Sequence, residues 1–395
     1  MEQRGGTLMK LETFQYTSHG KHKGWSIDQF PELDSENTLI IIFSSPDFIN
    51  DPTPIQELAK HYPSSQIIGC SSAGEIAGTH ISDHSLSVAI AKFEKTPIKI
   101  ASIQINSTEG SFKTGQQIAT MLNQDDLRGI FVLSDGLKIN GSELVKGLNT
   151  INKSNVVITG GLAGDGSEFK QTWTIYNGKI ITDTIVGVGF YGDYIQLGHG
   201  SCGGWDIFGP ERRITRSKNN VLYELDGKPA LALYKEYLGE KASGLPATGL
   251  LFPLAIRKST GDPHQLVRTI LGVDEKAGSL IFAGDMPEGY LAQLMRANFD
   301  RLIAGATEAG KLTFKKHVGL EQNNSPLLLI AISCVGRRLL LGERTEEETE
   351  SVLELFPEGT QQIGFYSYGE LSPYNEGTCD LHNQTMTLTS ITEEV

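Results

Sequence analysis

The stretch from Leu328 to Pro373 constrains the fold more than any other part of this 395-residue chain. An apolar run, Leu328–Ile332, leads into the sequence SCVGRR, an acidic helical segment follows, and a second strand runs into GFYSYGE. Two strands joined by a helix place the residues at their ends where ligand sites tend to be built. Such positions are predicted for Cys334, Arg337, Tyr366, Tyr368 and Glu370. These groups suit recognition of a small polar or planar ligand and specify no reaction.

The remaining strands predict a mixed fold. Thr38–Phe43 is a continuous apolar run, typical of a strand buried on both faces. Leu86–Phe93 and Ile98–Ile105 alternate and predict a hairpin, as do Val186–Tyr191 and Tyr194–His199. Hairpins interleaved with crossovers exclude a purely parallel doubly wound sheet. We expect a mixed α/β (α+β) fold of two packed mixed sheets with helices on the outside, in two halves of similar plan.

The two neighbouring arginines of SCVGRR raise the question of which one is buried. In a strand, alternation places Arg337 and Arg338 on opposite faces, so at most one points inward. Leaving a buried arginine without its partner costs about 3–5 kcal/mol, so the inward one must meet Glu370, Glu343 or a bound anion. A ligand carboxylate and an internal ion pair are both open.

One helix is expected after the strand at Leu328–Ile332, and one before it. After it, Thr345 and Glu348 have the spacing of a capping box at the start of the acidic helix. Before it, apolar residues recur at helical spacing from Pro287 to Ala306 and predict one long helix.

Composition limits the classes of partner and compartment. The net charge of −13 repels phosphate backbones, so we expect no nucleic-acid binding. No apolar run reaches the ~20 residues of a membrane span, and the start of the chain lacks the apolar core of a secretory signal. The four cysteines are far apart and form no CxxC pair. They predict neither a zinc knuckle nor a disulfide framework, and we expect a cytoplasmic protein.

A run of small residues, GCSSAGE, follows the buried strand at Gln66–Cys70. Small residues let a ligand approach the backbone, and consecutive N–H groups there could form an anion-binding nest. A tight structural turn is the other interpretation. The run also approaches the nucleophile elbow of hydrolases, although no helix is expected after it. The enzyme alternative is therefore a cysteine or serine hydrolase that uses Cys70, Ser71 or Cys334.

Five segments together resemble the FIST domain. They are GCSSAGE, the GGLAGDG that begins at Gly160, SCVGR, GFYSYGE and the LHNQTMT that begins at Leu381. The resemblance spans about Thr38 to Leu388. It implies a lead-in at residues 1–37, a FIST N-terminal domain at 38–225 and a FIST C-terminal domain at 226–395. The residues that it and the spacing assign to ligand binding are Cys70, Ser71, Ser72, Glu75, Gly161, Asp165, Cys334, Arg337, Tyr366, Tyr368, Glu370 and Asn383.

The resemblance implies a sensor of a small ligand. FIST proteins are sensory modules that report to signalling partners, so a histidine kinase or a cyclic-dinucleotide enzyme is the expected partner. No room is expected after Leu388 for a fused output domain, so the chain would act in trans. The ligand is either a small carboxylate, such as an amino acid, or haem with a response to nitric oxide.

If haem binds, the expected axial ligands are His382, His199 or His80. None of these histidines stands in a spacing that requires haem. His80 and His84 are four residues apart, but their loop-like context argues against a shared metal site.

Overall fold

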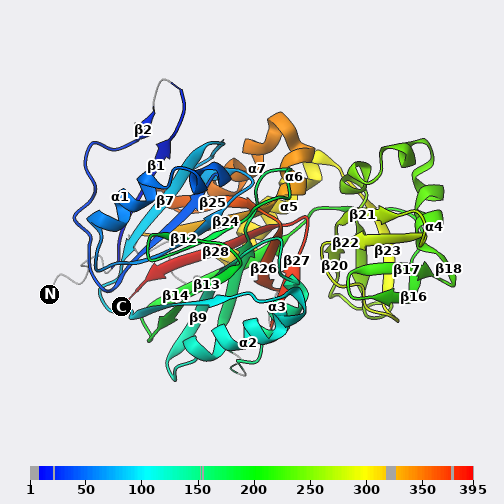
Figure 1. Cartoon of the computed structure of the whole chain (residues 1–395), viewed down its shortest axis with the longest axis horizontal. Coiled ribbons are helices and arrows are strands. Elements are labelled where there is room, and N and C mark those ends of the chain that lie inside the picture. Colours follow the sequence, from blue (N-terminus) through cyan, green and yellow to red (C-terminus); the bar gives the residue numbers. More distant parts are fainter. Residues whose placement is uncertain are drawn as a thin grey trace.

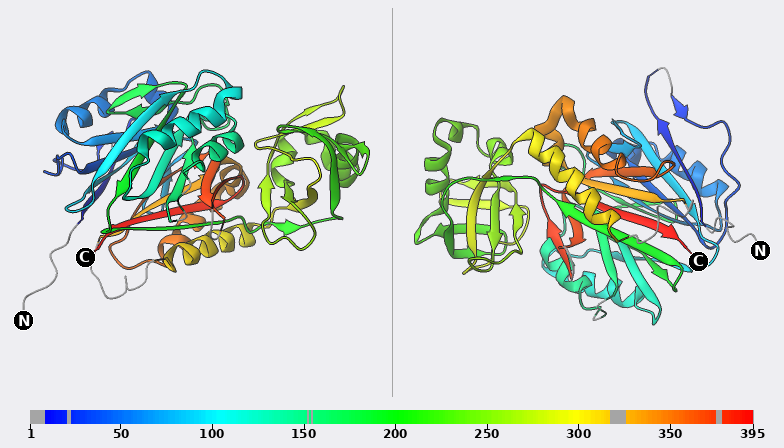
Figure 2. Two further views of the ribbon diagram at one scale, coloured as in Figure 1. Left: turned by 90° about the horizontal axis from the view of Figure 1, so that it is seen from below. Right: turned by 180° about the vertical axis from the view of Figure 1, so that it is seen from behind.

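The chain forms a larger body and a smaller domain that projects from one end of it (Figures 1 and 2). The computed structural model describes residues 9–20, 23–151, 153, 155–316, 326–374 and 378–394. Helices and several mixed sheets are both present, which confirms the expected mixed α/β class. Among the helices of these residues, none is long and apolar enough to cross a membrane.

Three sheets build the larger body, where two were expected. Sheet 1 has the order β12 (Lys179–Ile181), β11 (Thr174–Tyr176), β4 (Gln66–Ser71), β3 (Thr38–Ser44), β7 (Ser85–Lys92), β1 (Lys10–Thr17) and β2 (Gly24–Trp25). Sheet 2 has the order β27 (Cys379–His382), β26 (Gly369–Pro373), β10 (Val157–Leu162), β9 (Leu127–Ser134), β13 (Thr184–Tyr191) and β8 (Ile98–Gln104). Sheet 3 has the order β6 (His80–Ser82), β5 (Glu75–Ala77), β25 (Gln361–Ser367), β24 (Leu328–Cys334), β28 (Met386–Glu393) and β14 (Ile195–Cys202).

The three sheets share one strand plan, so the body consists of three structural repeats and not two similar halves. In each sheet a parallel pair stands at the centre: β3 with β4, β9 with β10, and β24 with β25. An antiparallel strand flanks each pair on one side, and a two-stranded hairpin flanks it on the other. Each hairpin comes from a different repeat. The β5–β6 hairpin of repeat 1 extends sheet 3, β11–β12 of repeat 2 extends sheet 1, and β26–β27 of repeat 3 extends sheet 2.

The sheets pack around a common apolar core, with the helices on their outer faces. In that core Phe43 of sheet 1 stacks on Phe365 of sheet 3, with ring centroids 4.7 Å apart. Helix α1 (Thr53–His61) covers sheet 1, and α2 (Ser111–Leu122) and α3 (Gly141–Leu148) cover sheet 2. Sheet 3 carries α5 (Phe299–Phe314), α6 (Val335–Leu341) and α7 (Thr345–Leu353). The expected placement of helices outside the sheets is therefore observed.

The smaller domain lies between β14 and α5 in the sequence and has its own core (Figure 1). Its nine-stranded sheet has the order β20 (Leu266–Arg268), β19 (Leu254–Arg257), β23 (Leu291–Arg296), β16 (Arg212–Lys218), β17 (Val221–Leu225), β22 (Ser279–Phe282) and β21 (Ile270–Asp274), with β15 (Asp206–Ile207) and β18 (Lys228–Pro229) paired at its sides. Helix α4 (Ala230–Leu238) packs against this sheet. The proposed boundary between residues 225 and 226 falls between β17 and β18, which pair with each other.

Several local predictions were wrong. The segments expected as hairpins, β7 with β8 and β13 with β14, belong to different sheets, because the chain passes from one repeat to the next at these points. The long helix expected after Pro287 is strand β23 followed by helix α5. SCVGRR does not continue as a strand, because helix α6 begins at Val335. Residues 1–8 of the expected lead-in lie outside the described residues, and β1 and β2 form the edge of sheet 1.

Candidate ligand-binding site

The loops that carry three of the sequence motifs interlock at the centre of the body. Each repeat crosses here from its own sheet to another, through residues 71–75, 162–174 or 366–370. Backbone hydrogen bonds join every pair of crossovers. Repeats 1 and 3 share two, Ala73 N to Tyr366 O at 2.8 Å and Tyr366 N to Gly74 O at 2.9 Å. Gly164 N donates to Ser71 O at 3.1 Å, and Tyr368 N donates to Leu162 O at 3.2 Å. The predicted motifs are thus brought together, although they are far apart in sequence.

A pocket of about 550 Å³ opens beside this junction. All three repeats line it: Ala73 and Ile81 from repeat 1, Gly166 and Ser167 from repeat 2, and Val335, Arg338, Leu339, Gly342, Glu343, Thr345 and Glu346 from repeat 3. The lining combines one guanidinium and two carboxylates with small apolar groups. Because motifs from three separate parts of the sequence meet at this pocket, we take it as the candidate site and call it the junction pocket.

Arg338 is the cationic group of the junction pocket. Its Nη1 and Nη2 donate to the two carboxylate oxygens of Asp83, each at 2.8 Å, and Nη1 also donates to Ala73 O at 2.7 Å. Its guanidinium carbon lies 5.7 Å from the centre of the Tyr366 ring. The hydrogen bonds from Arg338 lower the pKa of Asp83. The Arg338 side chain remains 24% exposed, so a ligand in the pocket can reach it.

Gly74 makes room for this arginine. Its φ of +135° is one that residues with a Cβ rarely adopt, and a Cβ there would lie 2.5 Å from Arg338 Nη1. The small residues of GCSSAGE were expected to make room for a ligand, but Gly74 makes room for the Arg338 side chain.

Arg337 is the buried arginine, and its partner is a residue that sequence reasoning missed. Its Nη2 lies 2.7 Å from Oε2 of Glu348, and both side chains are 0% exposed. Nε of Arg337 also donates to Glu348 Oε2, at 3.0 Å. Two backbone carbonyls accept as well, Gly203 O from Nη1 at 2.6 Å and Leu302 O from Nη2 at 2.8 Å. The internal ion pair is therefore the arrangement present, and neither Glu370 nor Glu343 is the partner.

Glu348 is the centre of a buried polar network beneath the pocket. Its Oε1 accepts from Ser333 Oγ at 2.9 Å and from Tyr366 OH at 2.7 Å, while Oε2 accepts from Arg337. The capping box predicted for Glu348 is wrong, because Thr345 is already the first residue of α7 and the carboxylate points into the protein. Tyr366 connects the network to the pocket, since its ring lies under Arg338 and its hydroxyl bonds Glu348.

Two buried glutamates hold the crossovers of repeats 1 and 3 in the same way. Glu75 accepts from Ser72 Oγ and, at 2.8 Å, from Ser85 Oγ. Glu370 accepts from Ser367 Oγ at 2.7 Å and from Thr385 Oγ1 at 2.9 Å. Burial raises the pKa of each carboxyl to about 8. In repeat 1 the glutamate thus links the crossover to Ser85, the first residue of β7. In repeat 3 it links the crossover to Thr385, which precedes β28.

The other predicted ligand residues are also buried. Asp165 bonds Tyr368 OH and accepts from three backbone N–H groups, including Lys170 N at 2.7 Å. Gly161 lies in β10, where a Cβ would come within 3.0 Å of Phe365. Asn383 is buried, and its Oδ1 has no hydrogen-bond partner among the described residues.

None of the twelve residues predicted to bind a ligand is among the described residues that line the junction pocket. All twelve are buried instead. The sequence left open which of Arg337 and Arg338 faces the pocket, and it offered Glu343 only as a partner for the buried arginine. Glu346 was missed, as was Asp83, which bonds Arg338. If SCVGRR had been interpreted as the start of a helix, Arg338 and Glu343 would have been predicted to lie near the crossovers.

The residues of the hydrolase alternative stand in surroundings that disfavour a nucleophile. Burial raises the pKa of the Cys70 and Cys334 thiols, which keeps them protonated and poorly reactive. Ser71 is buried, and its Oγ accepts a hydrogen bond from Trp173 N at 3.1 Å.

The three candidate haem ligands lie in different places. His382 is buried with its Nε2 3.0 Å from Ser372 O, and burial lowers its pKa to about 4. His80 is on the surface, 78% exposed, with Nδ1 3.3 Å from Glu346 Oε1. His199 lines a second pocket of about 630 Å³, together with His264, Lys315 and Lys316. Of the three, His199 alone borders a cavity large enough for a cofactor in the described part of the chain.

Two family models match the chain. The FIST N domain matches residues 38–228, and the FIST C domain matches residues 230–373. The chain belongs to the FIST family. FIST domains are associated with sensing in signal transduction and are generally non-catalytic.

Two further similarities are more distant. An uncharacterised protein of Methanocaldococcus jannaschii is 25% identical over 342 residues, which are 79% of this chain and 62% of that protein. The chain therefore spans less than two thirds of this curated relative. A cyanuric acid hydrolase from A. caulinodans is 11% identical over 76% of this chain and 100% of that chain, with a TM-score of 0.18. That score is too low to carry an argument about fold or activity.

Proposed function

We propose that this FIST protein is a sensor that binds a small ligand in the junction pocket and signals in trans. The observation that carries the proposal is the convergence of motifs from all three repeats on one pocket. A ligand held there contacts each repeat, so its binding can change how the repeats sit against one another.

The charges of the junction pocket favour an amino acid or a similar small carboxylate. Arg338 offers a planar fork of donors, which matches the two oxygens of a carboxylate. Glu343 and Glu346 lie in the same lining and suit an ammonium group. A zwitterion satisfies both signs of charge, whereas a simple anion leaves two carboxylates facing it.

Competition for Arg338 provides the two states that a sensor needs. Without ligand the guanidinium is bound by Asp83. A ligand carboxylate would take the place of Asp83, which is 60% exposed and can turn to solvent. Because ligand and Asp83 compete for the same donors, the ligand binds one state better than the other, as a population shift requires.

The partner that we propose is a histidine kinase or a cyclic-dinucleotide enzyme of the cytoplasm. Its support is the association of FIST domains with signal transduction. All four cysteines are free of disulfides, which agrees with a reducing compartment. The test is autophosphorylation of a histidine kinase that co-purifies with this protein, measured with and without the chain and the ligand. An unchanged rate under all conditions would refute this partner.

A thermal-shift screen of amino acids and organic acids tests the ligand. At a ligand concentration of about 100 times Kd, binding adds about 2.7 kcal/mol of stability and raises Tm. Arg338→Gln should abolish the shift. Arg216→Gln is the matched control, because Arg216 also bonds a carboxylate, Glu224 at 2.9 Å, beside a tyrosine ring. If Arg338→Gln keeps the full shift, the ligand does not bind in the junction pocket.

Haem is a second candidate ligand, favoured by the pocket around His199. His199 would hold the iron, and Lys315 and Lys316 would pair with the propionates. Bound haem supplies an iron that coordinates nitric oxide. Protein from cells fed a haem precursor should then show a Soret band that His199→Ala removes. A colourless protein would leave the junction pocket as the ligand site.

The hydrolase alternative is tested by a thiol-reactive probe. Labelling of Cys70 or Cys334 only after denaturation would rule out a cysteine nucleophile, as their burial leads us to expect. Rapid labelling of the native protein would support a cysteine nucleophile.

A further inference from the structure

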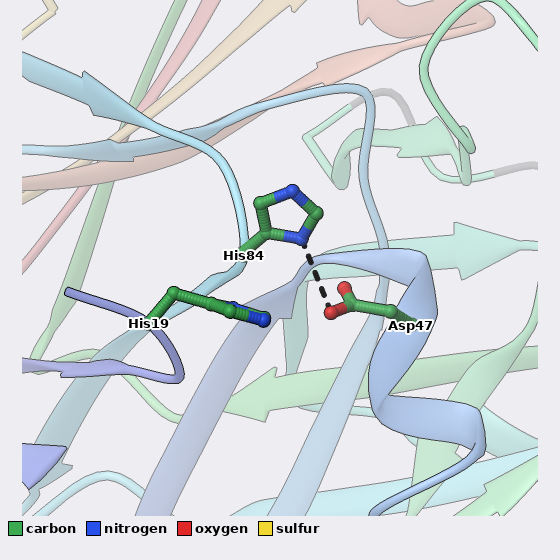
Figure 3. Close-up of side chains that lie close together, drawn as sticks. All are labelled: His19, Asp47 and His84. Carbon is green, nitrogen blue, oxygen red and sulfur yellow. Dashed lines mark hydrogen bonds and ion pairs between the residues drawn. The ribbon is translucent and has the colours of Figure 1, made fainter. Parts of the chain in front are cut away.

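We propose that His19, Asp47 and His84 form a binding site for a divalent transition-metal ion such as Zn²⁺. The three side chains face one another on the surface of repeat 1 (Figure 3). One ligand atom from each residue lies within 4.8 Å of the others. The site is separate from the junction pocket and from the pocket of His199, and it does not depend on the proposed sensory function.

Three segments that are distant in sequence supply the site. His19 follows β1, Asp47 stands in the short 3₁₀ helix η1 (Pro46–Ile49) after β3, and His84 lies in the turn between β6 and β7. Because β1 and β3 both pair antiparallel with β7, the C-terminal ends of β1 and β3 lie beside the start of β7, at one end of the sheet. The cluster therefore rests on the register of a rigid sheet.

The spacing of His84 and Asp47 already suits a shared ion. His84 Nδ1 lies 3.2 Å from Asp47 Oδ2. Two ligands that are each about 2.0–2.1 Å from one tetrahedral ion are about 3.3–3.4 Å apart. The ligand atom of His19 lies within 4.8 Å of those of Asp47 and His84 and has to come closer to share an ion with them. Its exposed side chain can do so by rotation about its own bonds.

Hydrogen bonds around the cluster orient its histidines. Ser18 donates through both its N, at 3.0 Å, and its Oγ, at 2.8 Å, to the carbonyl oxygen of His84, which ties the two segments together. Ser18 Oγ also lies 2.6 Å from His19 Nδ1, which leaves Nε2 of His19 for the ion. Partners of this kind, which bind the second ring nitrogen, fix the orientation of metal-bound histidines.

Asp47 provides the second observation in favour of an ion. Its Oδ1 is buried and has no hydrogen-bond partner among the residues that the structure describes. A buried carboxylate oxygen without a partner carries a cost, and a cation bound at Oδ2 would offset it, because Oδ1 belongs to the same carboxylate. His84 also holds a backbone φ of +56°, a conformation that few residues other than glycine adopt.

The ligand types select the class of metal. Two imidazoles and one carboxylate suit Zn²⁺, Co²⁺, Ni²⁺ or Cu²⁺, whereas Mg²⁺ and Ca²⁺ prefer sites built from oxygen. The ion would keep at least one position for water, because three protein ligands do not complete a tetrahedron.

Titration of the full-length protein with Zn²⁺ in a calorimeter tests the proposal, with Co²⁺ absorption as a second readout. We expect one ion per chain and a Co²⁺ spectrum without a thiolate band. His19→Ala, Asp47→Asn and His84→Asn should each weaken Zn²⁺ binding by about tenfold or more. Asparagine is chosen at position 84 because it tolerates a positive φ.

His264→Ala is the matched control, since His264 also pairs with one carboxylate, Asp380 at 2.9 Å, at a different place. It should bind Zn²⁺ as the unaltered chain does. Melting curves without metal check that each variant folds. The proposal is overturned if folded His19→Ala and His84→Asn bind Zn²⁺ with unchanged affinity, or if the unaltered chain binds no ion.

Discussion

The crossovers of repeats 1 and 3 have the same frame and different contents. Each has a serine three residues before a buried glutamate, and each glutamate is bound by a hydroxyl at the last strand of its repeat. Between serine and glutamate, repeat 1 has Ala73 and Gly74, whereas repeat 3 has Tyr368 and Gly369. The small residues of repeat 1 leave room for Arg338, whereas Tyr368 of repeat 3 places a large ring at the same point of the motif. Under the proposed function, a repeated backbone frame serves as a binding site in one copy because its side chains are smaller there.

The largest difference should come from the network beneath repeat 3. Glu348→Ala leaves Arg337 buried without its carboxylate, and we expect a loss of about 3–5 kcal/mol in the free energy of unfolding. Urea denaturation measures it. Tyr366→Phe removes only a hydroxyl from the same network and should cost about 1–2 kcal/mol. Equal losses for the two variants would show that the ion pair is not what this region depends on.

The glutamates should make the two crossovers respond alike to pH. Their pKa is about 8 in the folded protein and near 4.5 in the unfolded chain, so folding is favoured by their protonated form. Stability should fall by about 1.4 kcal/mol per pH unit and per glutamate as the pH rises from about 4.5 to 8. Glu75→Gln and Glu370→Gln should each remove the contribution of one glutamate to the pH dependence of the free energy of unfolding. A slope that is unchanged in one variant would break the equivalence of the repeats.

The paired glycines should separate the two crossovers. Gly74→Ala places a Cβ 2.5 Å from Arg338 Nη1 at a positive φ, and we expect a cost of about 1–3 kcal/mol together with weaker ligand binding. Gly369→Ala meets the flexible end of Leu381 at 2.9 Å and should cost less. Thermal melts of both variants measure the difference. A larger cost at Gly369 would contradict the role given to Gly74.

The smallest effect on stability should come from Arg338 itself. Its pair with Asp83 is partly exposed, and such pairs contribute about 0–1 kcal/mol. Arg338→Gln should therefore leave Tm within a few degrees of the unaltered protein while it abolishes the ligand-induced shift. A large loss of stability would mean that Arg338 is structural, as Arg337 is.

The sequence indicated the elements of this fold better than their partners. The strands β3, β4 and β24 follow from their apolar runs. The segments β7 and β8 alternate like a hairpin, yet the chain changes sheets between them. Local patterns record burial and turns, whereas the choice of sheet depends on strands that are distant in sequence.

The candidate site shows the same limit. The motifs located the junction, because small residues and buried charges at strand ends are visible in the sequence. The partner of Arg337 was not visible, because Glu348 lies in an acidic run where a capping role explains it equally well. The metal cluster was also hidden, since it joins His19, Asp47 and His84 through the register of sheet 1.

The exchange of hairpins among the repeats has a consequence for how the chain is made. No repeat contains a complete sheet, so none can fold as an independent unit during synthesis. Strand β28, at the C-terminal end of the described residues, pairs with both β14 and β24. Sheet 3 therefore stays open until β28 has left the ribosome. Contacts between such distant segments slow folding and leave strand edges exposed, so we expect this protein to depend on chaperones in the cell.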